Sequence, residues 1–121
     1  MSIKKVLVID DSATERHELG EILTSHGMTV VFAEDGESGV AKSKSEKPDL
    51  IMMDIVMPGM NGFQATHAIT HDPETSHIPV IICTTKGLET DKIWGMRQGA
   101  KNYVVKPVDA NDLMSKIAEL G

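Results

Sequence analysis

The chain has 121 residues, 40% of them hydrophobic, a length that suits one compact domain with its own core. Twelve basic against eighteen acidic residues give a net charge of −6, which argues against nucleic acid or an anionic membrane as a direct partner. A single cysteine excludes an intrachain disulfide. Because the sequence has no apolar run of about 18 residues, we expect a soluble cytoplasmic protein.

The first half of the chain alternates between strand and helix signals. An apolar run at residues 6–9 is typical of a strand, and Ser12 with Glu15 three residues later is the capping-box pattern that begins a helix. Residues 29–33 form a second predicted strand. The helical pattern that follows it ends before Pro48.

The second half repeats this order three times. Apolar runs at residues 50–53, 80–83 and 103–105 are typical of strands, and a helical pattern follows each of them. Asp109 is the predicted N-cap of the last helix. Five strand–helix units without an internal linker predict an α/β fold, a doubly wound (βα)5 sandwich around a parallel five-stranded sheet. They predict a single domain over residues 1–121.

Polar residues of reactive type stand where the predicted strands end. Asp10 and Asp11 follow the first strand, Asp54 the third, Thr84 the fourth and Lys106 the fifth. Ligands of open parallel sheets bind beyond the carboxyl ends of the strands, so we expect these side chains to share one edge. Each residue alone has an ordinary explanation as a turn, a cap or a solvated charge, but five of them at one edge favour a site.

The chemistry of these residues favours phosphoryl transfer. Two carboxylates about 4 Å apart repel by roughly 4 kcal/mol at an effective dielectric constant near 20, so an acidic cluster needs protonation or a cation. Oxygen ligands without histidine or cysteine suit Mg²⁺, which also binds phosphate oxygens. With Mg²⁺, the Lys106 ammonium and the Thr84 hydroxyl around it, Asp54 can act as a nucleophile toward phosphorus.

The set Asp10-Asp11, "MDIVMPGMNG", Thr84 and "KPV" resembles the CheY-like receiver domain of bacterial response regulators. The resemblance extends over residues 3–120 and implies a flavodoxin-like sheet with strand order 2-1-3-4-5. It implies that Asp54 accepts phosphate from a phosphohistidine on a CheA-like sensor histidine kinase.

The same resemblance implies roles for the neighbouring residues. Asp11, Asp54 and the backbone carbonyl of Val56 bind Mg²⁺, for which Mn²⁺ can substitute, and Asp10 assists. Lys106, whose peptide bond to the following proline is expected to be cis, contacts the phosphoryl group. Thr84 reports the arrival of that group. The expected switch and output face consists of Thr84, Leu88, Lys92, Met96, Tyr103 and Val105.

The expected function is therefore a stand-alone response regulator of a two-component phosphorelay. It is a monomer without an output domain, catalyses only its own phosphorylation and dephosphorylation, and signals by protein contact or acts as a phosphate sink. Its downstream or phosphatase partner is unknown, and neither nucleic acid nor membrane is expected. Segments such as "GFQATHAIT" and "ETDKIWGMRQGAKNY" resemble the receivers of chemosensory systems that control type IV pili and twitching motility.

Two departures from the commonest receiver pattern flank the site, and two other functions stay open. Thr85 is bulkier than the residue often found after Thr84, and Val56 is apolar where many receivers are polar; both leave the phosphoryl lifetime open. A Mg²⁺-dependent phosphohydrolase would need an acid where Val56 stands, and a cap domain. A flavodoxin-like electron carrier would need a Ser/Thr/Gly-rich phosphate loop where this chain has "DDSATE".

Overall fold

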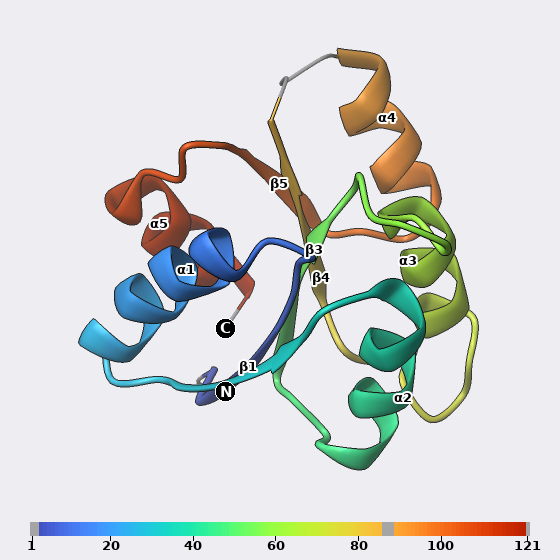
Figure 1. The fold of residues 1–121 in the computed structure, drawn as a ribbon, viewed down its shortest axis with the longest axis horizontal. Coiled ribbons are helices and arrows are strands. Elements are labelled where there is room, and N and C mark those ends of the chain that lie inside the picture. The colour runs from blue at the N-terminus through green and yellow to red at the C-terminus, as the bar shows by residue number, and fades with distance from the viewer. Residues whose placement is uncertain (1–2, 86–88, 121) are drawn as a thin grey trace.

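The computed structural model describes residues 3–85 and 89–120 and places a five-stranded parallel sheet between two layers of helices (Figure 1). The strands lie in the order β2-β1-β3-β4-β5, and every neighbouring pair is parallel. This confirms the predicted doubly wound, flavodoxin-like α/β fold. The elements in chain order are β1 (Lys5–Ile9), α1 (Ala13–Ser25), β2 (Thr29–Ala33), α2 (Gly36–Ser45), β3 (Leu50–Asp54), α3 (Gly62–Thr70), β4 (Val80–Thr84), α4 (Glu89–Arg97), β5 (Asn102–Val105) and α5 (Ala110–Leu120).

The two faces of the sheet are covered by different helices. Helices α1 and α5 lie on one face, and α2, α3 and α4 lie on the other (Figure 1). Because side chains alternate along a strand, Val6 and Val8 of β1 belong to the core under α1 and α5. Leu7 and Ile9 belong to the core on the opposite face. The fold therefore has two hydrophobic cores separated by the sheet.

The two central strands that lead to the candidate site are buried along their whole length. All five residues of β3 and all five of β4 are buried, as expected for parallel strands covered on both faces. Their last residues are Asp54 and Thr84, which are polar and nevertheless buried. The sheet thus presents these two side chains at its carboxyl edge.

The predicted helix starts are confirmed. The Ser12 hydroxyl accepts a hydrogen bond from the backbone N–H of Glu15 at 3.3 Å, and a carboxylate oxygen of Asp109 accepts one from Asp112 at 2.9 Å. The Lys106–Pro107 peptide bond is cis, as predicted. The capping box at the first helix is only half formed, however, because the side chain of Glu15 binds Lys106 instead of turning back to Ser12.

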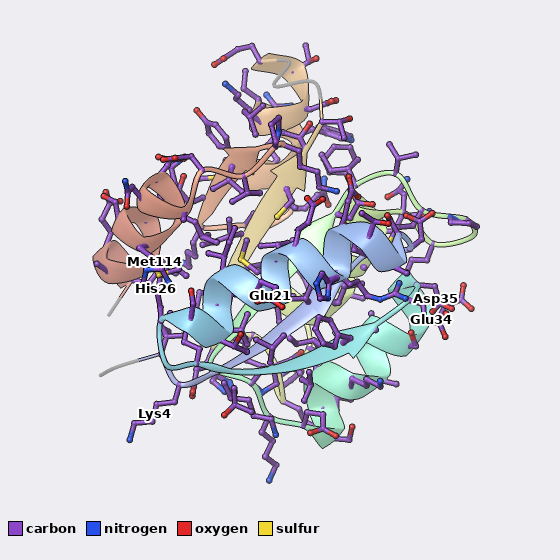
Figure 2. All side chains as sticks on the ribbon, turned by 60° about the vertical axis from the view of Figure 1, so that its left-hand side comes forward. Lys4, Glu21, His26, Glu34, Asp35 and Met114 are labelled. Atoms are coloured by element: carbon purple, nitrogen blue, oxygen red, sulfur yellow. The ribbon has the colours of Figure 1, made fainter. Side chains whose placement is uncertain are left out.

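The outer side of α1 faces solvent (Figure 2). Glu21 and His26 are exposed there, while Leu19 and Leu23 are buried against the sheet. Within residues 3–85 and 89–120, every helix is too short or too polar to cross a bilayer.

Candidate functional site

The carboxyl edge of the sheet brings together side chains that are far apart in the sequence. Asp10 follows β1, Asp54 ends the neighbouring strand β3, and Lys106 follows β5. The backbone N–H of Lys106 donates to the carbonyl oxygen of Thr84 at 2.7 Å, which ties the chain after β5 to the end of β4. The structure therefore gathers Asp10, Asp54, Thr84 and Lys106 at one edge, as their places at the strand ends predict.

The ammonium group of Lys106 is the centre of this cluster. Its Nζ donates to Asp54 Oδ1 at 3.0 Å, to Asp10 Oδ2 at 2.9 Å and to Glu15 Oε2 at 2.8 Å. Only 8% of the Lys106 side chain is exposed, so these charge-assisted bonds are shielded from water. The cluster holds one positive and three negative formal charges and is therefore an acidic site in net charge.

Burial changes the protonation behaviour of the two central groups. Burial raises the pKa of Asp54 to about 6, and the hydrogen bond from Lys106 offsets only part of that rise. Burial alone would lower the pKa of Lys106, but its hydrogen bonds to Glu15, Asp10 and Asp54 outweigh burial and raise that pKa. Lys106 therefore stays cationic, while Asp54 is mostly ionised at neutral pH and becomes neutral in mild acid.

The Asp10 side chain is fixed by the chain around it. Its Oδ1 accepts a hydrogen bond from the backbone N–H of Ser12 at 2.9 Å, while Oδ2 accepts from Lys106. Arg16 Nη1 donates to the Asp10 carbonyl oxygen at 2.7 Å, and the Asp10 N–H donates to the Ala33 carbonyl at 3.1 Å. These bonds hold a carboxylate that is almost fully buried.

A cavity of about 660 Å³ opens beside Asp54. Asp11, Val56, Thr84, Thr85 and Lys106 line it together with Asp54, and Glu15, Ile55 and Asp91 complete the lining. Its wall therefore offers carboxylates, a hydroxyl and an ammonium group to a ligand.

The acidic cluster beside this cavity has the chemistry of a site for a hard divalent cation. One carboxylate oxygen each from Asp10, Glu15 and Asp54 lie within 4.8 Å of one another. Oxygen ligands with an excess of negative charge suit Mg²⁺ better than softer metals. This cluster shares Asp10 and Asp54 with the predicted magnesium site but contains Glu15 in place of Asp11, so it matches the prediction in chemistry and not in every residue.

The match to a known protein family identifies the class of protein that this site belongs to. Residues 6–118 match the model of the response regulator receiver domain. The chain belongs to the response regulator receiver family. As a receiver, it is a signalling protein whose family implies a histidine kinase as phosphodonor and Mg²⁺ bound through acidic residues. The phosphohydrolase and the flavin carrier considered above belong to other classes of protein.

Several relatives share this receiver fold. Protein PilH of Pseudomonas aeruginosa PAO1 is 57% identical over 113 residues, which cover 93% of each chain. The phosphate regulon transcriptional regulatory protein PhoB of Escherichia coli K12 is 33% identical over 94% of this chain, but the match covers only 50% of PhoB. The solved structure of the chemotaxis response regulator CheY4 of Vibrio cholerae is 29% identical, has a TM-score of 0.90, and matches over 99% of this chain and 100% of its own.

Glu15 is the receiver's site residue that sequence reasoning missed. Its pattern with Ser12 is already explained locally as a capping box, which predicts no contact with the strand ends. The structure shows why Glu15 reaches the site, since α1 covers the face of the sheet that carries Val6 and Val8, and Asp10 continues their alternation. A carboxylate in the first turn of α1 is thereby close to the strand ends.

The other predicted metal ligands of the receiver line the cavity without joining the cluster around Lys106. Asp11 is exposed, and Val56 is 77% exposed. Both lie in the wall of the cavity beside Asp54. Thr85, which is bulkier than the residue often found at this position in receivers, also lines this wall.

The predicted output face surrounds Tyr103. The Lys92 ammonium lies 4.6 Å and the Lys116 ammonium 5.1 Å from the centre of the Tyr103 ring. Two cations therefore lie within cation–π distance of the same aromatic ring. Lys116 also donates to the Tyr103 carbonyl oxygen at 2.7 Å. Met96 of α4 and Val105 of β5 are exposed, as expected. Leu88 lies outside the described residues.

Proposed function

We propose that this receiver is a phosphoacceptor that takes a phosphoryl group on Asp54 from a phosphohistidine of a sensor histidine kinase. The observation that carries the proposal is the Lys106 ammonium, which binds the carboxylates of Asp54 and Asp10 at the mouth of an acidic cavity. A buried carboxylate beside a fixed cation is a nucleophile with a partner for the charge that arrives with phosphorus.

The transfer requires the ionised form of Asp54. One of its carboxylate oxygens forms a bond to phosphorus while the phosphorus–nitrogen bond of the phosphohistidine breaks, and the electron pair stays on the imidazole. Lys106 donates a hydrogen bond to a phosphoryl oxygen, and Asp10 holds Lys106 in place. Bound Mg²⁺, or Mn²⁺ in its place, would be held by Asp10, Asp11, Asp54 and the Val56 carbonyl and would neutralise phosphoryl charge.

The output is proposed to be a protein contact. Arrival of the phosphoryl group draws the Thr84 hydroxyl toward it, and the change passes to Tyr103 and to the face that carries Lys92, Met96 and Val105. A protein that instead only consumes phosphoryl groups from a shared kinase would need no such change.

The biological setting follows from the relative with the higher identity. PilH is 57% identical over 93% of both chains, and this supports a role in a chemosensory system that controls type IV pili and twitching motility. In this setting the receiver would be a cytoplasmic monomer of one domain, and its kinase would be CheA-like.

Asp54→Asn tests the phosphoacceptor directly. Incubation with acetyl phosphate and Mg²⁺ should give an acid-stable, base-labile adduct on the wild type and none on Asp54→Asn, because the amide is a far weaker nucleophile. Asp72→Asn is the matched control, since Asp72 forms its ion pair with Lys44 outside the site. Intact mass spectrometry measures the adduct, and an Asp54→Asn protein labelled at the wild-type rate would refute the assignment.

A further inference from the structure

The three carboxylates around Lys106 use the whole donor capacity of its ammonium group. A lysine ammonium has three N–H bonds, and Asp10, Asp54 and Glu15 each accept one of them. A phosphoryl oxygen that is to receive a hydrogen bond from Lys106 must therefore displace one of these acceptors.

The three acceptors differ in how freely they can leave. The side chains of Asp10 and Asp54 are 1% and 9% exposed, and both sit on short stems at strand ends. The Glu15 side chain is 34% exposed and has one more methylene group. Among the three, Glu15 is the carboxylate that water can solvate when it turns away from Lys106.

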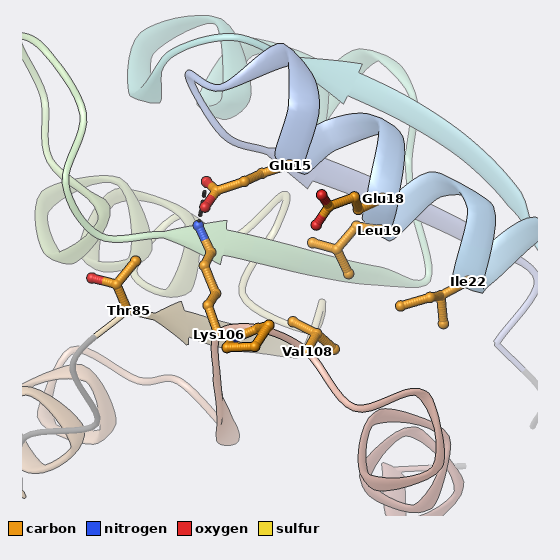
Figure 3. Close-up of a pocket in the computed structure, with 8 residues that line it drawn as sticks. Glu15, Glu18, Leu19, Ile22, Thr85, Lys106 and Val108 are labelled. Carbon is orange, nitrogen blue, oxygen red and sulfur yellow. Dashed lines mark hydrogen bonds and ion pairs between the residues drawn. The ribbon is translucent and has the colours of Figure 1, made fainter.

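Glu15 also stands between two hollows of the surface. It lines the cavity beside Asp54 and, with Thr85 and Lys106, a second groove of about 350 Å³ against Leu19 and Val108. Figure 3 shows the Glu15 carboxylate pointing from α1 to the tip of Lys106, at the boundary of that groove. The contact between Glu15 and Lys106 therefore lies at the boundary that the two hollows share.

We propose that Glu15 is a positioning residue that competes with the phosphoryl group for the Lys106 ammonium. In the unphosphorylated protein it holds Lys106 toward α1. Phosphorylation of Asp54 exchanges a carboxylate for a phosphoryl dianion and adds one negative charge to the cluster, so Glu15 is repelled and released. This inference rests on the proposed function of Asp54.

Glu15→Gln tests the competition against Glu18→Gln. Glu18 is exposed on the same helix and lines the same groove, but Figure 3 marks no contact between it and Lys106. With Mg²⁺ saturating, Glu15→Gln should bind beryllofluoride, a phosphoryl mimic, about fivefold more tightly than wild type, which is about 1 kcal/mol. Glu18→Gln should bind it as the wild type does. Isothermal titration calorimetry measures these affinities.

A spectroscopic readout separates release from a general change in charge. On beryllofluoride binding, the NMR chemical shift of the Glu15 side-chain carboxyl carbon should move toward the value of a solvated glutamate. The chemical shift of the same carbon in Glu18 should stay unchanged. An unmoved Glu15 signal, or equal beryllofluoride affinity in wild type and Glu15→Gln, would overturn the inference and leave the phosphoacceptor proposal standing.

Two further outcomes point elsewhere. If Glu15→Gln lowers the affinity for Mg²⁺, measured without beryllofluoride, Glu15 is a metal ligand and the competition is refuted. If wild type binds no beryllofluoride while retaining its fold, the phosphoacceptor function itself fails, and the inference fails with it.

Discussion

Ionised Asp54 weakens the fold that holds it. Its pKa rises from the ordinary 3.8 to about 6, mainly through burial, so the folded state disfavours the charged carboxylate relative to the unfolded chain. Since one pKa unit corresponds to about 1.4 kcal/mol and solvent screens part of the effect, ionised Asp54 lowers the free energy of unfolding by about 1–3 kcal/mol at neutral pH. A nucleophile that must be charged to react is thus kept at a cost to stability.

Asp54→Asn should therefore stabilise the metal-free protein at pH 7 by about 1–3 kcal/mol. Below the unfolded pKa, Asp54 is protonated in both states and its contribution to wild-type stability is fully present. That contribution is lost as the pH rises through about 6, so the difference between variant and wild type should widen from mild acid to neutral pH. Urea unfolding in the presence of a chelator measures it.

Asp72→Asn is a control for which we expect the opposite effect on stability. The hydrogen bond from Lys44 lowers the pKa of Asp72, so this carboxylate stabilises the fold above its unfolded pKa and loses that effect in acid. A stability gain of Asp54→Asn that is the same in mild acid and at neutral pH would contradict the burial argument.

The turn between β3 and α3 depends on close contact of two backbone segments. The Gly62 N–H donates to the Ile55 carbonyl at 2.8 Å. A Cβ atom at residue 62 would collide with the Asp54 carbonyl oxygen and lie 2.8 Å from the Ile55 Cα. The backbone that carries Asp54 is thus braced by a glycine at the start of the next helix.

Gly62→Ala should destabilise the protein by about 1–3 kcal/mol, because backbone atoms have to move to relieve the collision. Gly20→Ala is the comparison within α1. Its new Cβ would meet only the ring tip of Phe32 at 2.9 Å, and that side chain is partly exposed and can turn. Gly20→Ala should be neutral or slightly stabilising, since alanine favours a helix. Thermal unfolding of both variants tests the difference, and equal losses would contradict it.

Elements whose signals are local were predictable from the sequence. The apolar run ending in Asp54 predicted a buried strand with a polar end, and Ser12 and Asp109 predicted helix starts, because a strand or a cap depends on neighbours in the chain. The partner of Glu15 was not predictable in this way. Lys106 lies 91 residues further on, and a capping box explains Glu15 equally well from its immediate neighbours.

The cations on Tyr103 illustrate the same limit. Lys92 comes from α4 and Lys116 from α5, so their meeting on one ring follows from how two helices pack around β5. Periodicity within one element carries no information on such a contact.

The whole molecule carries an excess of negative charge, and part of it is concentrated at the site. The net charge is −6, and the cluster around Lys106 holds three carboxylates against one ammonium group. A divalent cation bound there relieves repulsion that the unfolded chain, with its separated carboxylates, does not have. Folding and metal binding are therefore expected to be linked.

Millimolar Mg²⁺ should raise the melting temperature, because a ligand that binds only the folded state stabilises it, by about 2.7 kcal/mol at a hundred times its Kd. The rise should be smaller in Asp54→Asn and Asp11→Asn. NaCl at matched ionic strength is the control for general screening. Differential scanning fluorimetry gives the measurement, and an equal effect of NaCl would argue against a specific magnesium site.

The sheet separates two sides of the molecule for which we expect different roles. Val104 of β5 faces the core under α1 and α5, where Glu15 reaches Lys106, while Tyr103 packs against the core on the other side. Substitutions in α1 should therefore alter the rate at which Asp54 is phosphorylated. Substitutions in α4 should alter how the protein binds its partner. Because the sheet separates the two cores, substitutions on one side can change the protein partner while the chemistry of phosphorylation on the other side stays the same.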